Sequence, residues 1–275
     1  ILRDAACPGC TVDSAVFAEA DLTGSDWEGS RFDQGVIAGS DLTRARLAGA
    51  RGRKLAIAGC RLEEADLSRG RFTELTLATP SDTRGLRMSG AVIERGVLQQ
   101  LELDGYDFRD MTLDACQFLE VSLTGADFRG MALGQCGFKG AALAGARFED
   151  AVTEYGLFME ADLTGASLRR AQLRQALLMG ADLSGADLAE ADLTMALLKE
   201  ARCPEASFAG ARLQYADLSH ADLSRADLTG AGLYQAKLHR IREEGAIWDG
   251  SSRDEAKETD GQRAGAEDFS PEESP

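Results

Sequence analysis

Two cysteines near the start of the chain have the spacing of a reactive or metal-binding pair. Cys7-Pro8-Gly9-Cys10 places two thiols three positions apart, a pattern found in thiol redox motifs and in zinc sites. The chain has only two histidines, His220 and His239, and neither lies at metal-ligand spacing from a cysteine or a carboxylate along the sequence. Whether the cysteine pair can do chemistry depends on where the surrounding segment directs these side chains.

Large apolar residues recur at every fifth position along most of the chain, and we call these the large positions. Two residues before each lies a small position, which is alanine in sixteen consecutive quintets from Ala161 to Ala236. A helix would spread residues of this period around its surface, and a strand would alternate them between its two faces. The chain must therefore turn once per quintet, and the sequence predicts a coil whose large and small positions face the interior.

The repeat also assigns the cysteines to the interior. Cys7 and Cys203 fall on large positions, and the others fall on small positions, namely Cys10, Cys60, Cys116 and Cys136. We interpret all six as reduced packing residues of a cytoplasmic protein. Because no nucleophile–base pair, phosphate loop or metal motif is found, the sequence predicts a non-enzymatic protein with no catalytic, cofactor-binding or metal site.

Phenylalanines alternate with leucines at the large positions in the middle of the chain. Phenylalanine recurs every ten residues, from Phe108 to Phe158, and follows a tyrosine or a small residue. The intervening leucines follow larger residues such as Met111 and Val121. This alternation conserves volume in each layer of a close-packed interior and predicts an even number of quintets per coil.

The quintets from Ala181-Asp182-Leu183-Ser184-Gly185 through Ala191-Asp192-Leu193 resemble those of the pentapeptide-repeat family. The resemblance covers residues 1–250 and implies an all-β fold, a right-handed quadrilateral β-helix with four quintets per coil. Counting the quintets then gives about 12 coils. The period slips by one residue near 78–87, where either a bulge or a short loop is expected.

The two ends of the repeat differ from its body. We expect a C-terminal cap over 241–250 and, from Ser251 to Pro275, a disordered acidic tail, because this segment has little to bury. The chain lacks an initiator methionine and starts in register at Leu2, which suggests a processed or truncated chain. No apolar run is long enough to span a membrane.

One face of the coil has apolar residues where other faces have polar ones. Twenty-residue spacing aligns eight outward side chains, and large exposed apolar patches mark interaction sites. We therefore predict a contact with a partner protein or with a second copy of the chain. The predicted partner-binding residues are Tyr155, Leu157, Met159, Leu177, Met179, Met195, Leu197 and Tyr215.

The net charge of −16 argues against direct binding of nucleic acid. A basic group surrounds Gly52, which stands at a large position. The group consists of Arg44, Arg46, Arg51, Arg53 and Lys54, and we interpret these charges mainly as charge balance on an acidic rod. The densest acidic stretch is opposed mainly by Arg109. It consists of Glu102, Asp104, Asp107, Asp110, Asp114 and Glu120.

Two functions remain open. The favoured one is a protein-interaction scaffold or adaptor, for which a rigid rod with an apolar face is suited. Leu238-His239-Arg240 and Ala246-Ile247-Trp248 resemble the ends of pentapeptide-repeat domains in bacterial proteins associated with type VI secretion, which implies a role in effector loading. The alternative, implied by other family members, is mimicry of DNA by an acidic rod that binds type II topoisomerase (gyrase) as an inhibitor or a protector.

Overall fold

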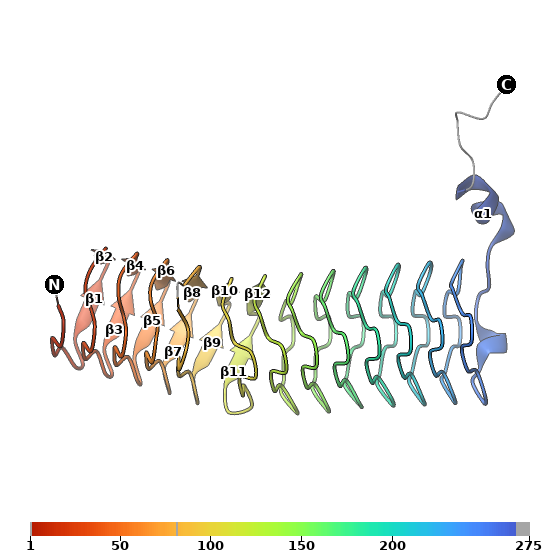
Figure 1. Cartoon of the computed structure of the whole chain (residues 1–275), viewed down its shortest axis with the longest axis horizontal. Coiled ribbons are helices and arrows are strands. Elements are labelled where there is room, and N and C mark those ends of the chain that lie inside the picture. The colour runs from red at the N-terminus through yellow and green to blue at the C-terminus, as the bar shows by residue number, and fades with distance from the viewer. Residues whose placement is uncertain (1, 81, 268–275) are drawn as a thin grey trace, which may run out of the picture.

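The computed structural model describes residues 2–80 and 82–267 and shows a straight rod of stacked coils (Figure 1). Two parallel sheets form its N-terminal half, in the orders β1-β3-β5-β7-β9-β11 and β12-β10-β8-β6-β4-β2. Every strand has three residues, because the chain turns after each short extended segment. The strands are β1 Thr11–Asp13, β2 Val16–Ala18, β3 Arg31–Asp33, β4 Val36–Ala38, β5 Arg51–Arg53, β6 Ala56–Ala58, β7 Arg71–Thr73, β8 Thr76–Ala78, β9 Val92–Glu94, β10 Val97–Gln99, β11 Thr112–Asp114 and β12 Gln117–Leu119.

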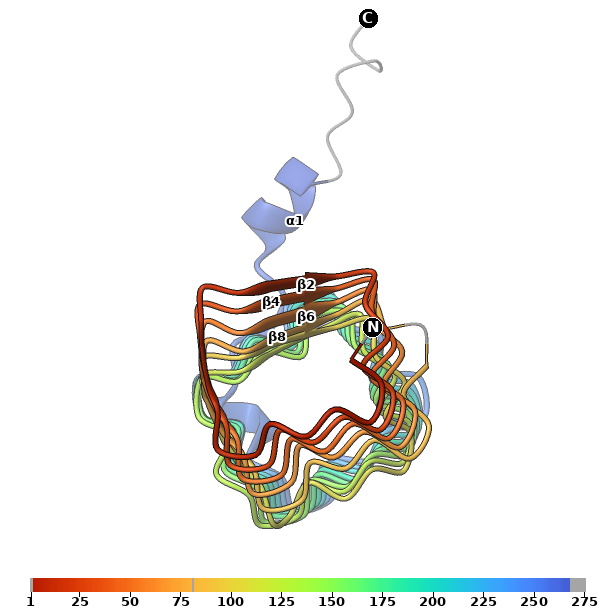
Figure 2. The ribbon, with the colours of Figure 1, turned by 90° about the vertical axis from the view of Figure 1, so that its left-hand side faces the viewer.

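Each coil takes twenty residues, as the register of the parallel pairs shows. Phe32 lies beside Gly52, and Gly52 lies beside Phe72. The two six-stranded sheets cover about five turns, fewer than the 12 coils counted from the sequence. Beyond β12 the same spacing continues as single parallel bridges, as far as that between Lys237 and Lys257. Viewed along the rod, the coils have a roughly four-sided outline (Figure 2), and the predicted fold class, a quadrilateral β-helix, is confirmed.

Corners form because one residue in nearly every quintet adopts a left-handed backbone conformation. Gly165 has φ of 62° and Tyr155 has φ of 60°, values that glycine adopts without strain. The aspartate of the quintet stabilises the same corner, since Asp162 Oδ1 accepts a hydrogen bond of 3.0 Å from the amide of Thr164. The aspartates of the repeat thus bind the amides of the corners.

The interior is filled by the large and small positions, as predicted. The side chains of Phe108, Phe128 and Phe148 form one stack, with ring centroids 4.5 and 4.8 Å apart. A second stack of Phe118, Phe138 and Phe158 has spacings of 5.0 Å and meets the first edge to face. Ladders of buried alanine and leucine continue this core from Ala161 to Leu238.

The phase slip is a single added residue at a corner. The amide of Gly59 donates to the carbonyl of Ala78, nineteen residues later, whereas the amide of Leu62 donates to that of Asp82, twenty residues later. The added residue therefore lies between Ala78 and Asp82. Leu77 still pairs with Leu98, so both large positions keep facing the interior.

The C-terminal segment differs from the expectation of disorder. Residues 253–255 form a 3₁₀ turn, η1 (Arg253–Glu255), and residues 261–267 form α1 (Gly261–Glu267). The Arg253 guanidinium, 4.4 Å from the Trp248 ring and 2.6 Å from Glu243, holds η1 against the last coil. The predicted disordered tail from Ser251 is therefore wrong up to Glu267, and its remainder, 268–275, lies outside the described residues. In the described part of the chain, no helix has both the length and the apolar character that crossing a membrane requires.

Candidate interaction surfaces

Three leucines form an outward ladder on consecutive coils. Parallel bridges place Leu157 beside Leu177 and Leu177 beside Leu197, and we call this row the apolar ladder. Its members are half-buried by one another, since neighbouring strands lie about 4.8 Å apart. Gly137 precedes the ladder and Asp217 follows it, so the apolar character is confined to three coils.

The corner beside this ladder carries large exposed side chains. Tyr155, Met195 and Tyr215 are 52%, 46% and 48% exposed, and we call them the apolar corner. Each has φ near 60°, a conformation that costs a non-glycine residue on the order of 1 kcal/mol. On the other side of the ladder, Met159 and Met179 are half-buried. All eight residues therefore lie where the twenty-residue spacing places them.

Tyr234 extends the apolar corner and was missed by the sequence analysis. Its ring meets that of Tyr215 edge to face at 5.5 Å, and it is 46% exposed. Tyr234 is nineteen residues from Tyr215, so the twenty-residue spacing does not align the two. Long aromatic side chains on neighbouring coils can still touch when their positions differ by one residue, and sequence spacing does not indicate such a contact.

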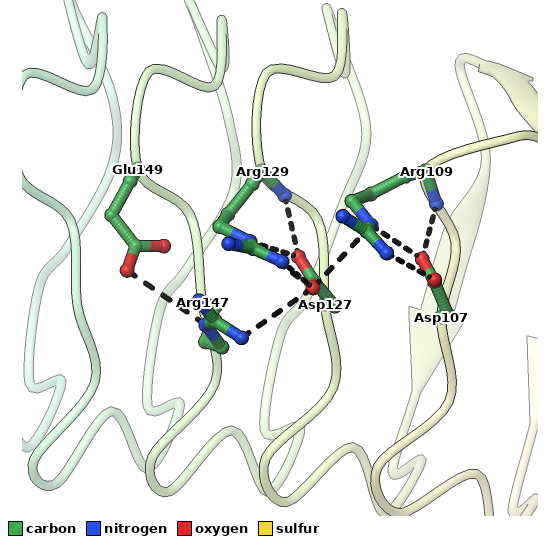
Figure 3. Close-up of polar contacts among 6 residues, drawn as sticks. All are labelled: Asp107, Arg109, Asp127, Arg129, Arg147 and Glu149. Atoms are coloured by element: carbon green, nitrogen blue, oxygen red, sulfur yellow. Dashed lines mark hydrogen bonds and ion pairs between the residues drawn. The ribbon is translucent and has the colours of Figure 1, made fainter.

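Beside the acidic stretch, arginines pair with Asp107 and with Asp127 of the next coil (Figure 3). Arg109 pairs with Asp107 at 2.6 Å and lies 3.4 Å from Asp127 on the next coil. Arg129 pairs with Asp127 at 2.6 Å, and Arg147 lies 3.7 Å from it. The acidic row of Asp107 and Asp127 lies beside Arg109 and Arg129 and ends at Arg147, unlike the uninterrupted phosphates of DNA.

These contacts change the acidity of the carboxyl groups. Hydrogen bonds from Arg109 lower the pKa of Asp107 to about 2. Hydrogen bonds from Arg129 likewise lower the pKa of Asp127, and they outweigh the opposing effect of its burial. Both groups are therefore charged through the neutral range.

The variant Asp127→Asn should test this network through its pH dependence. A lowered pKa in the folded state contributes stability that is complete above the unfolded pKa, about 3.9, and is lost as the pH falls through the folded value. At pH 7 the variant should lose about 1–3 kcal/mol of unfolding free energy, because three guanidinium groups lose a charged acceptor. Urea unfolding at pH 7 and pH 3 should show that the difference in unfolding free energy between the variant and the unmodified chain is smaller at pH 3. An equal difference in unfolding free energy at both pH values would contradict this prediction. The control variant is Asp110→Asn, since Asp110 makes no ion pair with the described residues.

The basic group around Gly52 divides into two parts. Arg46 pairs with Asp26 and Glu28, and Arg53 pairs with Asp33 at 2.8 Å, as charge balance predicts. Lys54 lies 3.9 Å from Glu74. Arg44 and Arg51 make no ion pair with a described residue, and Arg51 instead lies in a row with two arginines from other coils.

Most of the cysteines lie in the interior of the rod. Cys60, Cys116, Cys136 and Cys203 are buried, as predicted, and burial raises the pKa of the Cys60 thiol. Cys7 and Cys10 are only half-buried, because the first coil is covered by a neighbour on one side alone. All six thiols are free.

The two histidines meet a carboxylate that sequence spacing did not indicate. Their rings are 5.3 Å apart on adjacent coils, and Glu267 of α1 brings Oε2 to 3.1 Å from His239 Nε2 and 3.5 Å from His220 Nε2. His239 lies at an outward position of its coil but is only 4% exposed, because the segment leading to α1 covers it. The amide of Asp260 donates to His239 Nδ1 at 3.2 Å.

A metal ion fits this cluster poorly. The amide donor at Nδ1 leaves the ring proton on Nε2, which is the atom that faces Glu267 and would have to bind the ion. The Arg240 guanidinium lies 3.5 Å from the same carboxylate oxygen and would repel a cation. The arrangement is instead suited to holding α1 against the rod.

Comparison with known proteins identifies the repeat. The family model for pentapeptide repeats matches eight copies, over residues 15–51, 157–194 and 196–242. Among solved structures, HetL is 28% identical, over 94% of this chain and 92% of that chain, with a TM-score of 0.37. HetL is a pentapeptide-repeat protein involved in heterocyst differentiation regulation in the cyanobacterium Nostoc sp. strain PCC 7120.

Two further solved structures have lower TM-scores. A pentapeptide-repeat protein from the thylakoid lumen of Arabidopsis thaliana is 30% identical over 39% of this chain and 66% of that chain, with a TM-score of 0.21. A trypsin-treated form of QnrB1, a plasmid-mediated fluoroquinolone resistance protein, is 16% identical over 94% of each chain, with a TM-score of 0.28. No curated protein sequence matches the chain.

Proposed function

Since this chain is a pentapeptide-repeat protein, we propose that it acts as a non-enzymatic scaffold that binds another protein, or a second copy of itself, through one outer face. The observation that carries this proposal is the apolar ladder of Leu157, Leu177 and Leu197 with the apolar corner beside it. A rod filled with side chains offers its outer faces for binding, and one of them is suited to burying apolar surface.

The composition of this face favours a protein partner. Interface cores are enriched in tyrosine and methionine and depleted of charge, and Tyr155, Met195 and Tyr215 supply such side chains. The short parallel bridges hold the leucines in a rigid row, so little conformational entropy is lost on binding. At the ladder's end, Asp217 pairs with Lys237 at 3.0 Å and supplies a polar rim.

The double variant Leu177→Glu and Leu197→Glu tests the proposal. Both side chains point outward, so the fold and its circular dichroism should stay unchanged, while two carboxylates enter the centre of the contact. We expect partner capture or self-association to fall at least tenfold, because each desolvated charge opposes binding. Light scattering after size-exclusion chromatography reports self-association, and capture with mass spectrometry reports a partner.

A matched control places the same two charges on another face. Val152→Glu and Gln172→Glu lie in an outward ladder of their own and should leave assembly and capture unchanged. Equal losses in both double variants would indicate a general charge effect, and no loss in either would contradict the proposed face.

The captured partner distinguishes the finer hypotheses. Recovery of secretion components would support the effector-loading role that residues 238–248 suggest. Recovery of gyrase subunits would support the alternative, DNA mimicry. We place DNA mimicry second, because Arg109, Arg129 and Arg147 interrupt the acidic row.

A further inference from the structure

Three arginines lie side by side on the outer face of β3, β5 and β7. The register places Arg31 beside Arg51 and Arg51 beside Arg71, and we call this row the arginine ladder. All three side chains are exposed. With strands about 4.8 Å apart, the first and third arginine backbones are separated by about 10 Å.

No carboxylate from the described residues pairs with these arginines. Arg53, two residues along β5, shows the contrast, since it lies 2.8 Å from Asp33. Like charges directly opposite each other on neighbouring strands are destabilising. In a chain of net charge −16, three adjacent unpaired cations therefore cost stability and form a local site for an anion.

The arginine ladder borders a shallow hollow of about 250 Å³. Arg53 and Thr73 line its other side, and Gly52 contributes to its floor. Gly52 occupies a large position, yet a Cβ there would lie only 2.8 Å from Phe72 Cδ1. The basic residues thus meet over a surface depression, within reach of a ligand that enters it.

The neutral and acidic residues around the hollow limit the size of an anionic ligand. Thr11 and Val92 end the arginine row on β1 and β9. The parallel outward row becomes acidic at Asp33 and Asp13 on one side and at Glu94 on the other, where Glu94 accepts a hydrogen bond from Thr73 at 3.4 Å. A long polyanion such as a nucleic-acid strand would run from the arginines onto these carboxylates.

We propose that the arginine ladder binds a small ligand with two or more linked phosphoryl groups. Guanidinium groups match phosphoryl oxygens with two parallel hydrogen bonds each, which a lysine ammonium does not provide. A row about 10 Å long exceeds what one phosphate can contact, so a linked series engages it better. Binding removes the repulsion within the row and is therefore coupled to stability.

Calorimetric titration with tripolyphosphate, pyrophosphate and inorganic phosphate tests the proposal. We expect affinity to rise in the order phosphate, pyrophosphate, tripolyphosphate, and the melting temperature to rise with it. Arg51→Gln, at the centre of the ladder, should weaken tripolyphosphate binding at least tenfold and raise the melting temperature of the ligand-free protein. Because Arg51 is exposed, this variant retains the fold.

Arg46→Gln is the matched control, because it removes the same charge from an arginine paired with Asp26. It should bind tripolyphosphate as the unmodified chain does. The proposal would be overturned by no binding to the unmodified chain, by equal losses in the two variants, or by displacement of tripolyphosphate by sulfate at the same ionic strength. Tighter binding of a single-stranded oligonucleotide than of tripolyphosphate would also overturn it in favour of nucleic acid.

Discussion

Replacing Phe138 by alanine should lower the free energy of unfolding by about 3–5 kcal/mol, the largest loss expected from a single truncation in this rod. The Phe138 ring lies between those of Phe118 and Phe158, 5.0 Å from each and nearly parallel to both. It also meets Phe128 and Phe148 edge to face at 5.6 and 5.8 Å. Truncation leaves a cavity with four aromatic walls that the rigid coils cannot close.

The variant Phe138→Leu is the control for this prediction. Leu178 and Leu198 occupy the equivalent large positions two and three coils later and are fully buried, so leucine is compatible with the coil. We expect it to cost less than half of the alanine change, because most of the volume is kept. Thermal and urea unfolding would measure both, and equal losses would show that the stack is less closely packed than its geometry indicates.

The inward residues of the fold could be predicted from the sequence because a five-residue period is compatible only with a chain that turns once per quintet. Leu183 and Ala181 recur at positions that only a chain turning every five residues can direct inward, and both are fully buried. Asp162 and Asp182 recur at the same place in the quintet, and each accepts a hydrogen bond from a corner amide. Where each quintet repeats the same packing, local pattern and global structure agree.

Features that depend on contacts outside the repeat could not be predicted. His239 occupies an outward position, yet it is buried beside Glu267, which α1 brings back onto the rod. A seven-residue helix in an acidic segment has no periodic signal, and its contacts arise from docking. The expectation of disorder failed for the same reason, since composition does not report that Arg253 can stack on Trp248.

The arginine ladder has no signal among residues adjacent in sequence. The structural neighbours of Arg51 are Arg31 and Arg71, twenty residues away on each side. The same twenty-residue register predicts the apolar ladder from the sequence. The predicted partner contact of Leu157, Leu177 and Leu197 stays a prediction, because an outward row does not itself identify what covers it.

Replacing Ala186 by leucine should destabilise the rod by about 1–3 kcal/mol or more, because the interior has no room for a larger side chain. Ala186 is fully buried, and the same position one coil away on either side is Ala166 and Ala206, also fully buried. The amide of Ser207 donates to the carbonyl of Ala186 at 2.9 Å. A side chain that pushes the backbone outward would strain this bond and those of the adjoining coils.

The variant Ala142→Leu is the control, because it makes the same substitution at an outward position, where no overpacking results. Ala142 lies on an outward ladder between Ser122 and Asp162, so the same three heavy atoms enter solvent and should leave the melting temperature unchanged. Thermal unfolding of both variants then compares an inward with an outward position on one scale. If Ala186→Leu melts at the temperature of the unmodified chain, the small positions have free volume and the close-packed interior inferred from the sixteen alanines is incorrect.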